Sequence, residues 1–166
     1  PSGGINVYII ELNSTGSCTY ASHAKMIQSS SLPNDVELTD ITLDSNGDFF
    51  ITGWFNGEIL FGNVMSQSLN SGCGPSNTCW QRDIFIAKGS TGNNWDWWEN
   101  DDGNSGTSVE QGNVIEIDAN GDAILAGIVS SSNPFTGFTT SRYGGQDIFV
   151  AKFWSANGTI DWVTTA

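Results

Sequence analysis

An internal repeat is the feature of this sequence that most constrains its fold. Three runs rich in β-branched and aromatic residues share one pattern and favour β-strands: residues 6–11, 83–88 and 147–152. A polar, glycine-containing turn follows each run, and then a second predicted strand carries one aromatic residue: Tyr20, Trp97 and Trp162. We call this predicted hairpin unit A. The equivalent aromatic positions in its first strand are expected to point inward: Tyr8, Phe85 and Phe149.

A second repeated unit, unit B, lies between the copies of unit A, at residues 41–53 and 115–127. Each copy has two predicted strands around an Asn-Gly pair, which predicts a hairpin with a type I′ turn. The strand after each turn, residues 49–52 and 123–126, is largely apolar on both faces. A strand with this composition is expected to be buried on both sides.

The order of units is A-B-A-B-A, with four strands in each full repeat. This order predicts an all-β, β-propeller-like fold of four-stranded antiparallel blades, with about two and a half repeats. Residues 1–166 would form a single domain, with approximate repeats at 3–82, 83–146 and, in part, 147–166. A β-sandwich is the alternative fold, because about ten strands also suit one.

Two segments, residues 144–152 and 117–127, resemble the β-propeller repeat called SBBP. That repeat reads roughly Gly-Gly-x-Asp-x-Phe-Val-Ala-Lys, then Trp, then Val-Asp-x-x-Gly-Asn-x-Tyr-Val-Thr-Gly. The resemblance implies an exported surface protein of bacteria or archaea, and it brings no common catalytic residue. The chain departs from the pattern in its insertion at residues 63–82 and at Asn6, Ile10 and Glu11.

Both ends of the sequence fall in the same half of the repeat, because the first and last units are both unit A. Two closing halves would have to be complementary, so this order predicts a piece of a longer array. The alternative is a protomer that completes its sheets with other copies, or with further repeats of the same protein, through open sheet edges.

The charge balance narrows the class of partner. Eighteen acidic residues outnumber five basic ones, which gives a formal net charge of −13. Nucleic acids and anionic lipids bind clustered cations, and the five cations here are scattered. We therefore expect no nucleic-acid partner, and the absence of a long apolar run predicts no membrane insertion. An acidic, lysine-poor surface fits an extracellular or cell-surface location.

The cysteines also suggest a location outside the cell. Cys73 and Cys79 bracket a short loop, and the chain has only one histidine, His23, to complete a metal site. A local disulfide, formed in an oxidising compartment, is the prediction, and a pair of free thiols is the alternative. Cys18 is left over and is expected to be a small buried residue.

The turns of unit B carry the candidate metal ligands. Oxygen-bearing side chains alternate along both turns, as at the start of a calcium loop, but the later ligands of such a loop are missing. A structural turn in which these side chains accept local backbone donors is the alternative, and it is the one we favour. The candidate calcium ligands are Asp44, Asn46, Asp48, Asp118, Asn120 and Asp122. No other cofactor is expected.

Trp95 and Trp98 are the candidate ligand-binding residues, because tryptophan beside acidic and amide groups suits glycan binding. Packing in the core is the alternative, and Trp97 is expected to pack between blades as a repeat position. Asn13 and Asn157 lie in glycosylation triplets. No catalytic residues are predicted, so the expected function is a non-catalytic scaffold, adhesion element or assembly subunit. The alternatives are a lectin-like module and a fragment of a polysaccharide-active enzyme.

Overall fold

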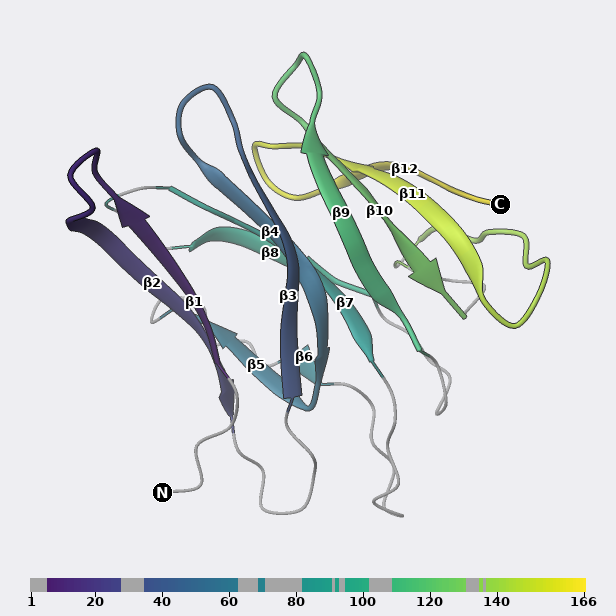
Figure 1. Ribbon diagram of the computed structural model, residues 1–166. Helices are drawn as coiled ribbons and strands as arrows, with labels where there is room; N and C mark the ends of the chain where they lie inside the picture. Colours follow the sequence, from purple (N-terminus) through teal and green to yellow (C-terminus); the bar gives the residue numbers. More distant parts are fainter. Residues whose placement is uncertain are drawn as a thin grey trace.

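The computed structural model describes residues 6–27, 35–62, 69–70, 82–90, 92, 95–101, 109–130, 135 and 137–166. Over these residues the protein is all-β, with twelve strands in three four-stranded sheets whose paired strands all run antiparallel (Figure 1). This confirms the predicted fold class at the level of all-β structure. No helix long and apolar enough to cross a membrane occurs in the described part of the chain.

Each sheet has its own strand order. Sheet 1 has the order β1 (Asn6–Leu12), β2 (Cys18–Ile27), β5 (Glu58–Phe61) and β6 (Leu69–Asn70). Sheet 2 has the order β3 (Asp35–Leu43), β4 (Phe49–Asn56), β7 (Asp83–Gly89) and β8 (Trp95–Asn100). Sheet 3 has the order β9 (Gln111–Ile117), β10 (Ala123–Val129), β11 (Asp147–Phe153) and β12 (Ile160–Thr165).

Sheets 2 and 3 each join one unit B to the unit A that follows it. The second strand of unit B pairs with the first strand of unit A, and the register is the same in both sheets. Gly53 lies opposite Phe85, and Gly127 lies opposite Phe149. A side chain at either glycine would collide with the facing phenylalanine ring and with a carbonyl oxygen of the first unit B strand. The repeat seen in the sequence is thus a repeat of strand pairing.

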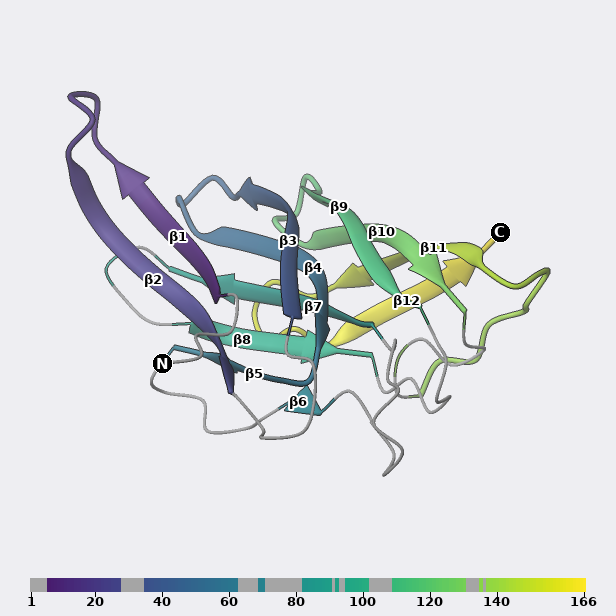
Figure 2. The same cartoon turned by 60° about the horizontal axis from the view of Figure 1, so that its bottom comes forward.

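The three sheets stack side by side with sheet 2 in the middle (Figures 1 and 2). One core cluster lies between sheets 1 and 2, and a second lies between sheets 2 and 3. Because side chains alternate along a strand, each first strand of unit A has two faces. We call one the Ile face, formed by Val7 and Ile9, Ile84 and Ile86, and Ile148 and Val150. We call the other the Phe face, formed by Tyr8 and Ile10, Phe85 and Ala87, and Phe149 and Ala151.

Both interfaces between sheets use these faces in the same way. The Ile face of sheet 1 and the Phe face of sheet 2 share one core cluster, which includes Val7, Ile9 and Phe85. The Ile face of sheet 2 and the Phe face of sheet 3 share the second cluster, which includes Ile84, Ile86 and Phe149. The stacking is therefore head to tail, and it leaves the Phe face of sheet 1 and the Ile face of sheet 3 at the two ends.

The position of a sheet in the stack determines how deeply its residues are buried, and one prediction of burial was wrong. Phe85 and Phe149 are buried as predicted, but Tyr8 is 65% exposed because it lies on the outer face of sheet 1. The prediction that the strand at residues 49–52 is buried on both faces is confirmed, since every residue of β4 is buried. In β10, by contrast, buried and half-buried residues alternate, because sheet 3 ends the stack.

Two smaller predictions were wrong. Cys18 is exposed, with its thiol 3.3 Å from the carbonyl oxygen of Tyr20. The unit B turns are three-residue loops instead of type I′ turns: the Gly47 N–H donates to the carbonyl of Asp44, and the Gly121 N–H donates to that of Asp118. These loops end on a glycine with positive φ, the geometry of a type I turn followed by a bulge.

Candidate functional site

An open backbone edge on β1 distinguishes sheet 1 from the other sheets. In sheets 2 and 3 the first strand of unit A is paired on both sides, with β4 and β8 for β7, and with β10 and β12 for β11. The equivalent strand β1 pairs with β2, and no other strand in the described ranges pairs with it. An unpaired edge of this kind presents backbone donors and acceptors to any strand that can lie beside it.

The direction of the backbone groups at this edge follows from the turn after β1. The N–H of Asn13 donates to the carbonyl of Ser17, 2.9 Å away, on the side of β2. Backbone groups alternate along a strand, so the N–H and C=O of Tyr8 and Ile10 point to the open edge. In sheet 3 the same alternation holds, because Ile148 exchanges hydrogen bonds with Ala166 on the far side from β10.

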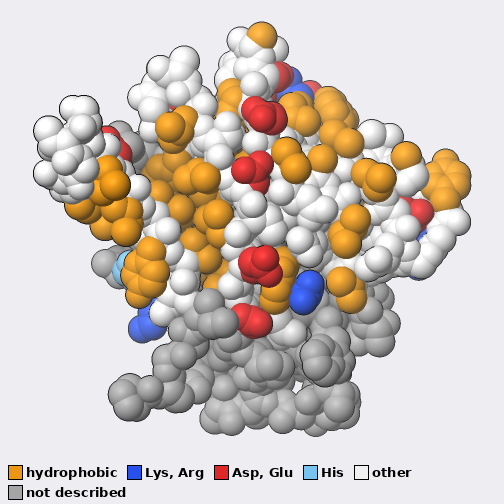
Figure 3. Space-filling model, viewed as in Figure 1, with side chains coloured by type: hydrophobic (Ala, Val, Ile, Leu, Met, Phe, Trp, Pro, Cys, Tyr) orange, Lys and Arg blue, Asp and Glu red, His pale blue; other side chains and the backbone are white. Residues whose placement is uncertain are grey.

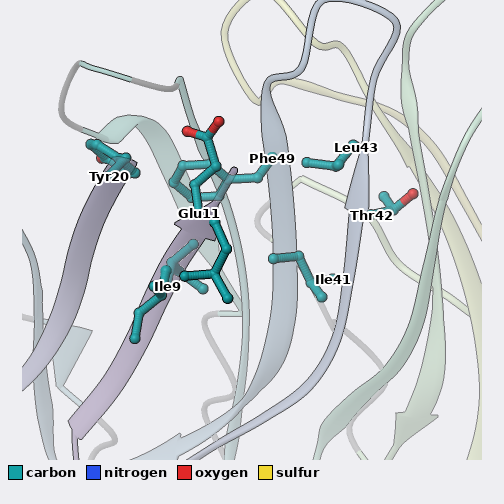
Figure 4. A pocket seen from close by; sticks show the side chains of 9 residues that line it. Ile9, Glu11, Tyr20, Ile41, Thr42, Leu43 and Phe49 are labelled. Atoms are coloured by element: carbon teal, nitrogen blue, oxygen red, sulfur yellow. The ribbon is translucent and has the colours of Figure 1, made fainter. Parts of the chain in front are cut away.

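An apolar pocket of about 530 Å³ adjoins this edge. It separates β1 and β2 of sheet 1 from β3 and β4 of sheet 2, and hydrophobic side chains gather there on the surface (Figure 3). Figure 4 shows Ile9, Glu11 and Tyr20 on one side and Ile41 and Leu43 on the other. The lining residues are Ile9, Ile10, Glu11, Leu12, Tyr20, Ile41, Thr42, Leu43 and Phe49.

The repeat explains why this pocket exists. Ile41 and Leu43 of β3 are 45% and 63% exposed, whereas Ile115, the equivalent of Ile41 in sheet 3, is only 1% exposed. Ile115 is buried in the core between sheets 2 and 3, where β9 contacts β3 and β4 of the preceding sheet. Among the described residues, sheet 1 has no unit B strands, and no described strand covers Ile41 and Leu43 in the way that β3 and β4 cover Ile115. The pocket therefore lies where the unit B hairpin of sheet 1 would lie.

No sequence pattern marked the pocket residues as a binding site. Ile10, Leu12, Ile41 and Leu43 look like ordinary strand residues in the sequence. The signal that could have found them is the order of units, because within residues 1–166 the first unit A is not preceded by a unit B.

The first candidate calcium turn is held by its own hydrogen bonds. The Oδ1 atom of Asp44 accepts the backbone N–H groups of Asn46 and Asp48, at 2.8 and 3.0 Å. The carboxylate of Asp48 pairs with the ammonium of Lys88 at 3.0 Å. These contacts are those of the structural alternative, in which the side chains accept local donors.

The second candidate turn repeats this arrangement with a tighter ion pair. Asp118 Oδ1 accepts the N–H groups of Asn120 and Asp122, while its Oδ2 lies 2.8 Å from Lys152 Nζ. Asp122 Oδ2 is 3.0 Å from the same ammonium. The hydrogen bond from Lys152 lowers the pKa of Asp118, and the hydrogen bonds to Asp118 and Asp122 raise the pKa of Lys152. A lysine ammonium thus occupies the position between the two carboxylates.

No arrangement of three or more His, Cys, Asp or Glu side chains suited to hold a metal occurs among the described residues. Calcium binding by the unit B turns therefore stays a prediction without support from the described geometry.

The two candidate glycan-binding tryptophans lie in the core between sheets 1 and 2. Trp95 is buried, its Nε1 donates to the carbonyl of His23 at 3.2 Å, and its ring meets Phe49 and Phe61 edge-on. Trp98 is partly buried, and its ring stacks on Phe61 at 6.0 Å. These contacts are those of the packing alternative, because the ring of Trp95 offers little free surface to a sugar.

The repeat position occupied by Trp97 does pack between sheets. Trp97 is buried, and its Nε1 donates to the carbonyl of Ser155 in sheet 3, 2.8 Å away. The equivalent Trp162 is 40% exposed, because sheet 3 is the last of the stack.

The candidate modification sites have different outcomes. Asn13 and Asn157 are exposed turn residues whose side-chain oxygens accept backbone donors, from Thr15 and Thr159 respectively. Cys73 and Cys79, with their predicted disulfide, lie outside the described residues.

Comparison with known proteins adds no family assignment. No protein-family model matches the chain, and no curated protein shows significant similarity to it. The resemblance to SBBP-type repeats therefore stays a prediction that rests on the two segments at residues 117–127 and 144–152.

Proposed function

We propose that the chain is a non-catalytic, extracellular repeat scaffold of the β-propeller-like kind, which assembles through its stacked sheets. The single observation that carries this proposal is the head-to-tail use of the same two faces at both interfaces between sheets. A stack built in this way always ends in one Ile face and one Phe face, which are complementary to each other.

The burial of equivalent residues supports this proposal. Ile84 is fully buried in the middle sheet, but its equivalent Ile148 at the end of the stack is 59% exposed. At the opposite end Tyr8 is exposed, although its equivalents Phe85 and Phe149 are fully buried. The end faces thus keep the apolar character of buried faces, and contiguous exposed apolar residues mark interaction surfaces.

The other functions receive less support. The two tryptophans of the glycan hypothesis make core contacts, and the resemblance to SBBP-type repeats brings no common catalytic residue. The extracellular location is supported by the acidic, lysine-poor composition and by the resemblance to exported repeat proteins.

Sedimentation of the chain over a range of concentrations tests the assembly function. Every copy of residues 1–166 presents both end faces, so we expect the average mass to rise with concentration. The variant Ile148→Arg should remain a monomer, because it places a charge on the Ile face of sheet 3. Ser45→Arg adds the same charge on an exposed turn away from both end faces, and it should associate like the natural chain.

A natural chain that remains monomeric at all accessible concentrations would contradict the proposal. Equal association of Ile148→Arg and Ser45→Arg would contradict the assignment of the end faces.

A further inference from the structure

We propose that the open edge of β1 binds a β-hairpin supplied by a polypeptide segment outside residues 1–166, which has the unit B pattern and a basic residue after its turn. This inference rests on the proposed scaffold function and names the kind of partner that completes sheet 1. Three features of the described residues carry it: the open backbone, the apolar pocket and the charge of Glu11.

The backbone defines the type of partner. The first strand of unit A binds the second strand of a unit B hairpin in both complete sheets, with the same register. In β1 the backbone groups of Tyr8 and Ile10 point away from β2, to the side that unit B occupies in the complete sheets. No described strand pairs with β1 on that side. An antiparallel strand at this edge would therefore meet a donor and acceptor pattern already used twice in the fold.

The pocket explains why a hairpin fits better than a single strand. A strand beside β1 would satisfy the backbone groups of Tyr8 and Ile10. A second strand beyond it would correspond to β9, which lies against β3 and β4 in the interface of sheets 2 and 3. It would cover Ile41 and Leu43 as sheet 2 covers β9. Two strands thus account for both the open edge and the exposed residues of β3.

Charge selects among such hairpins. In the complete sheets, Lys88 binds Asp48 and Lys152 binds Asp122, so a lysine of unit A meets an aspartate that follows the unit B turn. The equivalent residue of β1 is Glu11, which is exposed and lines the pocket. An aspartate at the same hairpin position would repel Glu11, whereas lysine or arginine would pair with it.

The same comparison argues against a second copy of the chain as the partner. Both unit B hairpins within residues 1–166 are already paired in sheets 2 and 3. Both also carry aspartate after the turn, at Asp48 and Asp122, where Glu11 calls for a cation.

The test uses two synthetic hairpins added to the full chain with the Ile148→Arg substitution, which removes self-association. One hairpin copies residues 111–129 with Asp122→Lys, and the other keeps Asp122. We expect the hairpin with Asp122→Lys to bind about tenfold more tightly than the hairpin that keeps Asp122. The reason is that an attractive charge pair with Glu11 replaces a repulsive one at a partly exposed site. Binding should slow amide exchange at Tyr8 and Ile10 and leave Ile9 unchanged, because Ile9 already faces β2.

Two variants of the protein sharpen this test. Glu11→Lys should reverse the preference, so that the unmodified hairpin binds more tightly. Ile10→Pro removes an N–H that points away from β2, which an edge strand tolerates, and it should abolish binding while the β1–β2 pairing remains protected.

The outcomes separate this inference from the proposed function. Failure of both hairpins to protect Tyr8 and Ile10, with self-association of the natural chain intact, would overturn the partner hairpin alone. If the two hairpins bind equally tightly to the protein with Glu11, and also to Glu11→Lys, the proposed basic residue of the hairpin is overturned. A different result would be that a second copy of the chain, with no hairpin added, slows amide exchange at Tyr8 and Ile10, and that Ile10→Pro removes this effect. That result would overturn the proposed hairpin and show that the chain exchanges a hairpin of its own.

Discussion

Sheet 1 and sheet 3 each contain four strands around one copy of unit A, yet only sheet 3 is built from a complete repeat. In sheet 3, unit B occupies one side of the unit A hairpin, and β11 is paired on both sides. In sheet 1, that side is open, and β5 and β6 are added on the other side, next to β2. The number of strands is the same, but the positions filled are different.

This difference shows what completes a sheet of this kind. Tyr8, Ile10 and Ile41 are exposed, whereas their equivalents in sheet 3 are buried. Adding β5 and β6 to the far side leaves the edge of β1 and the pocket beside it open. Burial therefore depends on which side of the repeat is filled, and the following changes test this dependence from the largest effect to the smallest.

Substitution of equivalent aromatic residues should give the largest contrast. Phe149→Ala removes a fully buried ring that packs on Phe135 at 5.7 Å, and we expect a loss of about 3–5 kcal/mol in the free energy of unfolding. Tyr8→Ala removes an exposed side chain at the same repeat position, and we expect a loss below about 1 kcal/mol. Urea unfolding measures both, and equal losses would contradict the difference between the two sheets.

The glycine opposite the buried phenylalanine gives the next effect. A Cβ atom at Gly127 would lie 2.0 Å from the carbonyl oxygen of Gln111 and 2.7 Å from a ring carbon of Phe149. We expect Gly127→Ala to lower the free energy of unfolding by about 1–3 kcal/mol. Gly145→Ala, where a Cβ atom would meet nothing within 4 Å, is the control and should stay within about 0.5 kcal/mol. A tolerated Gly127→Ala would mean that the two strands are not packed this closely.

The lysine of unit A should give a smaller, pH-dependent effect. Lys152→Met removes the ion pairs with Asp118 and Asp122 and should destabilise the protein at neutral pH. The folded state lowers the pKa of Asp118, so this contribution is complete above about pH 4 and disappears as the pH falls through the lowered value. It raises the pKa of Lys152, so the contribution also disappears as the pH rises through a value above about 10.5.

Thermal unfolding of Lys152→Met and the natural chain at a series of pH values measures this effect. Glu11→Met, at the same repeat position of sheet 1, removes no ion pair with any described residue and should change the midpoint little at any pH. A constant difference between Lys152→Met and the natural chain across the range would contradict the assigned ion pairs.

Calcium should have the smallest effect of all. Lys152 already occupies the position between Asp118 and Asp122, so we expect added calcium to leave the melting temperature of the chain unchanged. A rise that saturates with calcium, and that is lost in Asp118→Asn, would instead support the calcium hypothesis for the unit B turns.

The sequence predicted the local elements of this fold well, because strands and hairpins depend on neighbouring residues. The period-two pattern of unit A and the Asn-Gly turns of unit B were enough to place strands around them. The side chains of Asp44 and Asp118 accept backbone donors as the turn alternative required. The register of Gly53 and Gly127 then repeats in two sheets.

The remaining features depend on contacts that are distant in sequence. The pairing of β5 with β2 and the exposure of Tyr8 are set by which sheet lies beside them. Trp95 and Trp98 carry no local sign that they lie in the core between sheets 1 and 2. The pocket beside Ile41 exists because no described unit B strand belongs to sheet 1, which is a property of the whole stack.

Amide hydrogen exchange at three equivalent residues tests most directly whether β1 is an incomplete copy of β7 and β11. In the free monomer, we expect the N–H groups of Phe85 and Phe149 to exchange only on global unfolding, and the N–H of Tyr8 to exchange rapidly. Equally slow exchange at Tyr8 would contradict the account, because it would require a strand already paired with the open edge.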